Sequence, residues 1–209
     1  MGFVKSSLIL GAIEKFEDKL EEQRTVAREK SRQQDEEWAC QMRVAYTGGR
    51  TIKHRETMLG MDREGKLLYR VFQGLLGKGG KAAVKDADGQ TVAVIRDVKI
   101  KPPGVKDALG VIIGGEPFGF VYRTKATLLN GYKHDFSYHF DPVGLDLVKP
   151  KNPFDYSREI QDASGSVVAV VSVSSLIEGE RYRLNYNDAR NGLLYLTLLL
   201  AEKVSVADL

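Results

Sequence analysis

The sequence predicts a mainly β fold: a closed barrel of about twelve strands wrapped around a hydrophobic C-terminal helix, preceded by a long N-terminal helix. Three observations support this prediction. Turn signals built on Gly, Pro, Asn and Asp recur roughly every 8–15 residues after residue 43. Between them, β-branched and aromatic residues alternate with polar ones, as expected of strands with two different faces. Finally, the chain ends in an apolar segment that has no polar face.

The apolar segment predicts a helix over residues 188–203. From Leu193 to Ala201, Thr197 is the one polar side chain, so a helix here must be covered on every side. Either Asn187 or Asp188 is suited to cap its start, because both side chains accept backbone N–H bonds. The segment is shorter than the about 20 apolar residues that cross a bilayer. We therefore expect a buried helix inside the domain, with no transmembrane span.

Residues 1–42 form the first predicted unit, a charged amphipathic helix over residues 3–42. They contain no proline and are rich in good helix formers. One narrow apolar stripe runs along the helix, comprising Ile9, Ile13, Phe16, Leu20 and Ala27. Acidic residues precede basic residues along the axis. Two interpretations stay open: a solvated helix resting on the domain, or a helix that binds a protein partner or a second copy through residues 3–41.

The first residues, Met1-Gly2-Phe3-Val4-Lys5-Ser6, fit the loose pattern for N-myristoylation of Gly2. Short patterns of this kind match by chance often. We therefore favour an N-terminus without lipid contact over a lipid anchor.

An internal repeat organises residues 43–209, the second predicted unit. Asp86–Ile95 aligns without gaps with Asp162–Val171, and Asp62–Val71 is a weaker third copy. Each copy reads as an Asp-x-x-Gly turn followed by a strand. The glycine supplies positive φ and the aspartate can bond the turn backbone, so the repeat is interpreted as structural. The strand Val167–Val171 is apolar on both faces, and we expect the stripe Ile9, Ile13, Phe16 and Leu20 to cover its outer face.

These residues resemble the tubby C-terminal-like superfamily, and within it the LURP-one-related group, with phospholipid scramblases as more distant relatives. The resemblance is carried by the segments at 61–71, 85–95 and 162–171 and by the C-terminal helix. It covers about residues 43–209 and implies a barrel threaded by that helix. It also implies a non-enzymatic module, because tubby domains bind membrane phosphoinositides. It carries no head-group residues over to this chain, and it disfavours scramblase activity because the helix is short.

Composition excludes several classes of function. The chain has 209 residues and a formal net charge of +3, far from the basic density of a dedicated nucleic-acid binder. Cys40 is the single cysteine, so disulfides and paired-cysteine zinc sites are excluded, and a reducing, cytoplasmic compartment is favoured. The stretch Gly77–Ala82 fits a dinucleotide fingerprint, but the helix that this motif requires does not follow it. We expect no cofactor.

The candidate metal-ligating histidines are His54, His134 and His139. On a strand through Tyr132–Phe140, one face is aromatic and the other carries Asp135, His139 and Asp141. A second histidine close in sequence is lacking, so we expect no metal site and interpret this segment as a barrel strand. No nucleophile motif is present, and no catalytic residue is predicted.

The candidate binding residues are five lysines, which we expect to form a patch for phosphate head groups at one end of the barrel: Lys78, Lys81, Lys85, Lys99 and Lys101. The predicted function is a non-enzymatic intracellular module that contacts anionic membrane lipid or a protein partner through its outer surface, peripheral at the inner membrane face. The alternatives are a scaffolding protein that associates through the N-terminal helix, and an uncharacterised enzyme.

Overall fold

The fold is described from a computed structural model, and the description covers residues 3–36, 40–44, 55–76, 80–105, 107–129, 132–149, 155, 157–176, 179–186 and 188–206. These residues form two long helices, a short 3-10 helix and twelve strands. The strands are β1 (Cys40–Val44), β2 (Arg55–Met61), β3 (Leu67–Leu76), β4 (Gly80–Asp86), β5 (Thr91–Asp97), β6 (Ala108–Ile113), β7 (Glu116–Leu129), β8 (Tyr132–Asp141), β9 (Leu145–Val148), β10 (Arg158–Gln161), β11 (Val167–Leu176) and β12 (Gly179–Tyr186).

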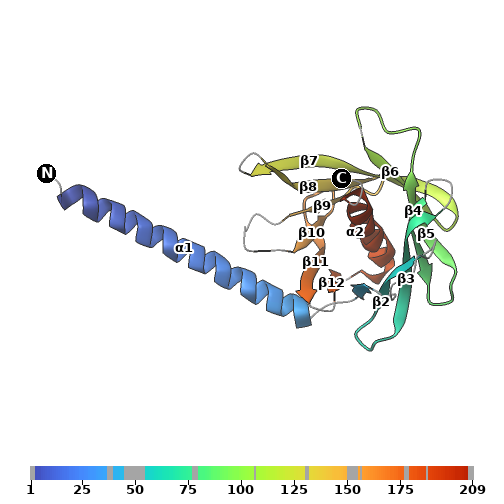
Figure 1. Cartoon of the computed structure of the whole chain (residues 1–209), viewed down its shortest axis with the longest axis horizontal. Helices are drawn as coiled ribbons and strands as arrows, with labels where there is room; N and C mark the ends of the chain where they lie inside the picture. Colours follow the sequence, from blue (N-terminus) through green and yellow to red (C-terminus); the bar gives the residue numbers. More distant parts are fainter. Residues whose placement is uncertain are drawn as a thin grey trace.

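Every strand pairs antiparallel with its neighbours in sequence, and β1 also pairs with β12. The last pairing places Met42 opposite Tyr182 and closes the strand order into a barrel. Figure 1 shows the strands arranged around the C-terminal helix. A mainly β fold with a C-terminal helix is thus confirmed.

Helix α2 (Gly192–Val206) occupies the centre of the barrel and follows the 3-10 helix η1 (Ala189–Asn191). Asp188 caps the start, because its Oδ1 accepts a bond from the Arg190 amide at 3.0 Å. This confirms the predicted cap. The boundaries predicted as 188–203 are corrected at both ends: the first turn is 3-10 and the helix continues to Val206.

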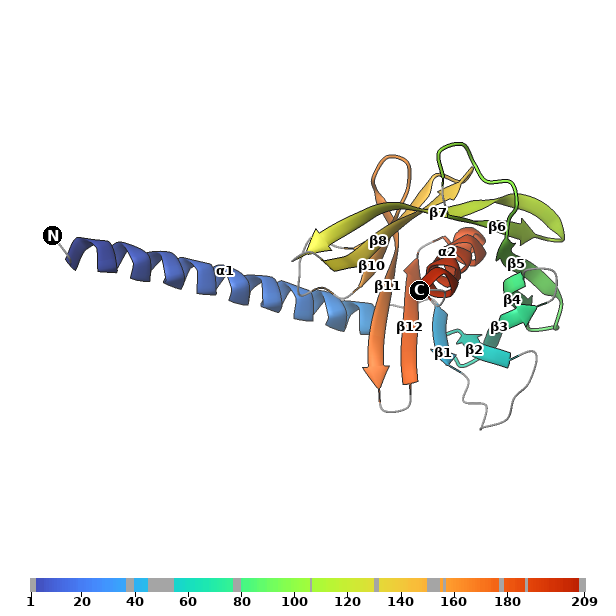
Figure 2. The same cartoon turned by 45° about the horizontal axis from the view of Figure 1, so that its top comes forward.

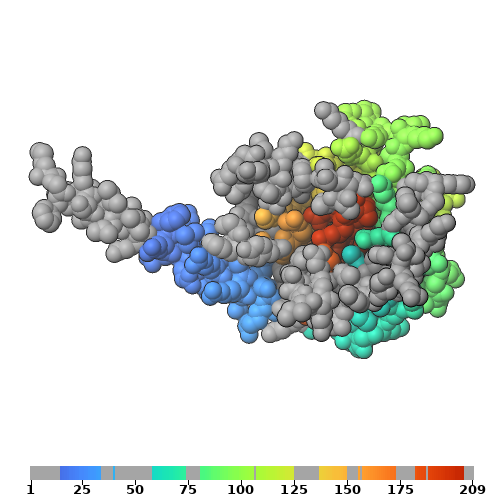
Figure 3. Space-filling view, viewed as in Figure 1, coloured from blue at the N-terminus to red at the C-terminus, as the bar shows by residue number. Residues whose placement is uncertain are grey.

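The core lies between α2 and the inward-facing residues of the strands. Tyr195–Glu202 are all buried, and the only polar groups among them are Thr197, Glu202 and the Tyr195 hydroxyl. The Thr197 hydroxyl donates to the Leu193 carbonyl at 2.7 Å, so its polar group is satisfied within the helix. The space-filling view in Figure 3 shows the red atoms of α2 at the open end of the barrel. Among the described residues, no helix combines the length and apolar character needed to cross a bilayer.

The three repeated turns have the same geometry and connect β2–β3, β4–β5 and β10–β11. Gly65, Gly89 and Gly165 each have φ of +82°. The leading aspartates, Asp62 and Asp86, accept bonds from the amides of Lys66 and Gln90 at 2.7 and 2.8 Å. Asp162 accepts the equivalent bond from Ser166 at 3.0 Å. The structural interpretation of the repeat is confirmed.

Helix α1 (Phe3–Glu36) is shorter than the predicted 3–42. Cys40, which the sequence placed in this helix, lies in β1 instead, and its side chain is buried. Burial, with a contribution from Asp62, raises the pKa of the thiol to about 12, so it stays protonated at neutral pH. Figure 2 shows that most of α1 projects away from the barrel and that its C-terminal end lies beside β11 and β12.

The contact of α1 with the barrel is centred on Ala27, which is buried, and Lys30. The Lys30 ammonium lies 2.8 Å from carboxylate oxygens of both Asp155 and Glu159. The expectation that Phe16 would cover β11 is wrong, because Phe16 is 63% exposed. The side chains of Ile9 and Ile13 lie outside the described residues.

Burial alone would lower the pKa of Lys30, but hydrogen bonds to Asp155 and Glu159 outweigh it and raise this pKa above 10.5. Burial alone would raise the pKa of Asp155, but bonds from Lys30 and Ser157 lower it below 3.8. The ion pair therefore stabilises the docked helix fully at any pH between the ordinary pKa of an aspartate, 3.8, and that of a lysine, 10.5. That stability is lost as pH falls through the lowered pKa of Asp155, or rises through the raised pKa of Lys30.

If α2 fills the barrel tightly, truncating one of its buried side chains leaves a cavity. Leu198→Ala is expected to lower the free energy of unfolding by about 2–5 kcal/mol, since Leu198 is fully buried. Urea denaturation followed by circular dichroism measures this change. The control is Val167→Ala, because Val167 is 48% exposed. A loss for Leu198→Ala no larger than that of the control would contradict a filled lumen.

Candidate functional site

A groove of about 680 Å³ lies on the outer face of the barrel over β5, β6 and β7. Its lining combines charged, aromatic and glycine residues: Arg96, Asp97, Val98, Lys99, Ile100, Gly110, Val111, Ile112, Pro117, Phe118, Gly119, Phe120, Asp141 and Pro142. Residues 98–105 follow β5 and project beyond the sheet, as the green loop in Figure 2 shows. The groove therefore lies outside the lumen that α2 fills.

The floor of the groove is one row of residues across four strands. Arg96 on β5 pairs with Gly110 on β6, Gly110 pairs with Phe120 on β7, and Phe120 pairs with Asp141 on β8. The next residues along these strands face the core, since Ile95, Val111, Val121 and Phe140 are all buried. Side chains alternate between the two faces of a strand, so the row faces outward. Gly110 contributes no side chain to this row, and Val98 packs over it from the segment that follows β5.

Both walls of the groove depend on a glycine. A Cβ at Gly110 would lie 2.5 Å from Val98 Cγ1, so the chain after β5 folds onto β6 only because this position is a glycine. A Cβ at Gly119 would lie 2.1 Å from the Asp141 carbonyl oxygen and 2.7 Å from Pro142 Cδ. The absence of both side chains lets residues 98–100 and 141–142 close in from two sides.

The two ends of the row carry opposite charge. Arg96 is exposed at one end, and the exposed Lys99 lies near it in the groove lining. Asp141 is exposed at the other end. Asp97 is neutralised within the wall, because the Lys81 ammonium lies 3.6 Å from its Oδ2. The groove is therefore basic on the β5 side and acidic on the β8 side.

Apolar side chains project at the rim. Ile100 is 85% exposed, and it is flanked in sequence by Lys99 and Lys101. Phe118 is 39% exposed and its ring meets that of the buried Phe140 edge-on, with centroids 5.9 Å apart. The rim therefore combines an exposed isoleucine with two flanking lysines.

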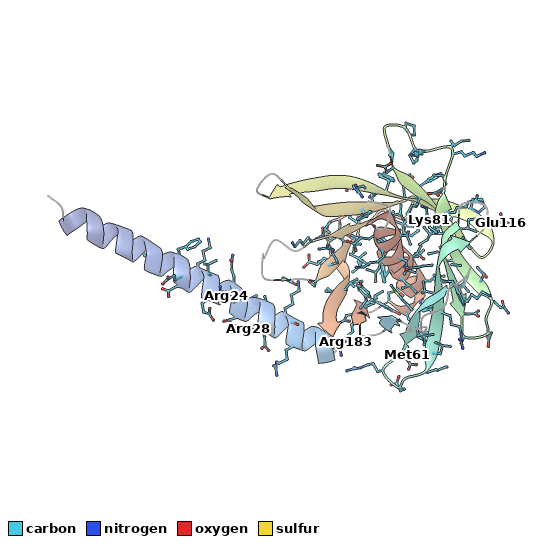
Figure 4. All side chains as sticks on the ribbon, in the orientation of Figure 1. Arg24, Arg28, Met61, Lys81, Glu116 and Arg183 are labelled. Carbon is cyan, nitrogen blue, oxygen red and sulfur yellow. The ribbon has the colours of Figure 1, made fainter. Side chains whose placement is uncertain are left out.

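The structure places the five predicted lysines at different points. Lys99 lines the groove, and Lys81 borders it through its ion pair with Asp97. Lys101 lies 4.0 Å from Asp107. Lys85 lies near the far end of β4, where its ammonium is 5.4 Å from the centroid of the Phe72 ring. Lys78 lies outside the described residues. Figure 4 labels Lys81 and Glu116 on the side of the barrel that carries the groove.

Several groove residues were not among the predicted site residues. In the sequence, Arg96 is one of several residues in a basic stretch, and Asp141 ends the strand that carries His139. Gly110 and Phe120 carried no signal at all, because their importance depends on strand register. The one usable signal was Lys99-Ile100-Lys101, an apolar residue between two lysines in a segment rich in turn residues.

On the exposed face of β8, His139 contacts Asp146 and Tyr122. His139 Nδ1 lies 3.0 Å from Asp146 Oδ1, and the His139 ring packs against Tyr122 with centroids 5.4 Å apart. Burial, together with the carboxylates of Asp141 and Asp146, raises the pKa of Tyr122. Within the described part of the chain, no three His, Cys, Asp or Glu residues are placed to hold a metal ion. The Asp135 side chain lies outside that part.

Comparisons with known proteins give one structural likeness. The X-ray structure of a protein from Arabidopsis thaliana matches with a TM-score of 0.46 and 18% sequence identity, covering 80% of this chain and 94% of that chain. No model of a known protein family matches, and no curated protein matches. The function is therefore inferred from the residues of the groove.

The wall formed by Val98 gives a direct test of the groove geometry. Gly110→Ala is expected to lower the free energy of unfolding by about 1–3 kcal/mol, because the new methyl group overlaps Val98. Combining it with Val98→Ala should recover most of this loss, since the overlapping atoms are then removed. Urea denaturation of both single variants and the double variant measures the coupling. Additive losses would contradict the contact between Val98 and β6.

Proposed function

We propose that this protein is a non-enzymatic binding module that contacts anionic phospholipid head groups at a membrane surface through the groove over β5, β6 and β7. The observation that carries the proposal is the placement of Arg96 and Lys99 beside the exposed Ile100. The basic side chains would meet lipid phosphates, and Ile100 would enter the interface below them. Such a contact is peripheral and fits the inner, anionic face of a cellular membrane.

The filled lumen supports an outer-surface site. The buried residues of α2 occupy the space in which a barrel of this width would otherwise hold a ligand. The groove, by contrast, opens to solvent and has charged side chains at its rim. Of the predicted lysine patch, the proposal keeps the part near Lys99. Lys85 is left out, because it lies at the end of β4 that is away from Arg96 and the groove.

We also propose that the chain is a divergent relative of the LURP-one-related group. The support is the set of three Asp-x-x-Gly turns with equal glycine φ, together with the apolar helix inside the strands. The lipid proposal does not depend on this relationship, since it rests on the groove residues alone.

Reversing the basic side of the groove should abolish membrane binding. We expect the double variant Arg96→Glu/Lys99→Glu to bind anionic vesicles at least roughly tenfold more weakly than the unchanged protein. The reason is that each basic residue near the membrane surface contributes about 1 kcal/mol of binding free energy. Vesicles of phosphatidylcholine with phosphatidylglycerol provide the assay, at low and at physiological salt.

The matched control is Arg63→Glu/Lys66→Glu, which changes the net charge equally in the exposed β2–β3 turn. It should retain binding. If the control variant loses as much binding, the loss is explained by net charge and not by the groove. If the unchanged protein does not bind anionic vesicles, the proposal is wrong.

A second candidate function is scaffolding through α1. Its support is that the barrel contacts the end of the helix near Lys30, while Phe16 is exposed on the projecting part. Figure 4 shows Arg24 and Arg28 on the neighbouring turns of the same projecting helix. An exposed apolar residue on such a helix is suited to pair with another helix.

Self-association through α1 predicts a mass above that of one chain in size-exclusion chromatography with light scattering. Phe16→Glu should return the protein to a monomer, because a buried charge opposes helix pairing. Thr25→Glu serves as the control, since it adds the same charge at another exposed position. A monomer at every protein concentration would exclude this candidate.

A further inference from the structure

The groove is not uniformly basic, and this constrains the head group that fits it. Along the row Arg96–Gly110–Phe120–Asp141, a guanidinium stands at one end and a carboxylate at the other. Both end residues are exposed, and both line the groove. A ligand carrying only negative charge would be attracted by Arg96 and Lys99 but repelled by Asp141.

Arg96 on β5 and Asp141 on β8 stand at opposite ends of the row. Three strand spacings of about 4.8 Å place the two backbones roughly 14 Å apart along the sheet. The groove that includes both residues has a volume of about 680 Å³, which leaves room for a small head group.

The acidic end also offers an aromatic surface. Phe120 lies directly between Gly110 and Asp141 in the row, and it lines the groove with Phe118. An ammonium group is stabilised both by a carboxylate and by the face of an aromatic ring. The basic end, with Arg96 and Lys99, is suited to a phosphate.

From this arrangement we infer that the groove selects aminophospholipid head groups, with the phosphate at Arg96 and Lys99 and the ammonium at Asp141 and Phe120. The selected unit is phosphoethanolamine, which phosphatidylserine and phosphatidylethanolamine share. This inference rests on the proposed membrane-binding function and specifies its ligand. It follows from charge complementarity at both ends of one groove, with Ile100 and Phe118 at the rim as the apolar contact.

The test compares two vesicle types of equal surface charge. Phosphatidylcholine vesicles receive the same mole fraction of either phosphatidylserine or phosphatidylglycerol; each added lipid carries one net negative charge, but only phosphatidylserine carries an ammonium. The unchanged full-length protein is expected to bind the phosphatidylserine vesicles up to about fivefold more tightly, the upper range for an exposed ion pair. Adding phosphatidylethanolamine to phosphatidylglycerol vesicles should also strengthen binding.

Asp141→Asn should remove the preference for phosphatidylserine and leave binding to phosphatidylglycerol equal or stronger, because the repelling carboxylate is gone. Asp88→Asn, at an exposed position of the β4–β5 turn, is the matched control and should keep the preference. Arg96→Gln should weaken binding to both vesicle types.

Equal binding of the unchanged protein to both vesicle types would overturn the selectivity while leaving the membrane-binding function intact. A preference that survives in Asp141→Asn would also overturn it. Failure to bind either vesicle type would overturn both proposals together. Soluble phosphoethanolamine should compete more strongly than inorganic phosphate, and equal competition would contradict recognition of the ammonium.

Discussion

The structure depends on covering one helix on every side. Helix α2 exposes apolar side chains around its whole circumference, and each fully buried leucine contributes about 1.5–3 kcal/mol. A flat sheet or a second helix would cover only one face of it. A sheet whose first and last strands pair, β1 with β12, covers all of them and leaves no strand edge open. In return, the helix fills a space too wide for the barrel's own side chains.

In this arrangement, β10 contacts both the central helix inside the barrel and the projecting helix outside it. Arg158 faces inward, where its Nε lies 3.1 Å from Oε1 of Glu202 on α2. The adjacent Glu159 accepts a bond from Lys30 of α1 at 2.8 Å. Two consecutive residues of one strand thus contact the central helix and the projecting helix. The partly buried charges are compensated in pairs, as burial requires.

The elements set by local chemistry could be predicted from the sequence. The cap at Asp188 and the three Asp-x-x-Gly turns depend on residues within a few positions of each other. The end of α1 could not be predicted in this way. Residues 33–37 are polar helix formers without Gly or Pro, so nothing local stops the helix before Cys40. Pairing of Cys40–Val44 with β2 and β12 overrides that propensity, and this pairing is a property of the closed sheet.

The groove was less accessible to sequence reasoning for a related reason. Arg96 and Asp141 become neighbours only through the registers of three strand pairs, and a shift of one residue would turn either of them to the other face. The register between β6 and β7 shifts between Val111 and Ile112, so simple alternation along β7 does not give the correct faces. A basic stretch is visible in the sequence, but the opposing carboxylate is not.

The filled lumen also decides where recognition can occur. Because the helix occupies the interior of the barrel, the surface is what remains for a ligand to contact. Outward residues on a barrel wall usually form a continuous layer of side chains. Here Val98 packs over Gly110 in that layer, and Asp141 and Pro142 pack against Gly119. The groove therefore forms where two glycines let residues 98–100 and 141–142 approach the sheet closely.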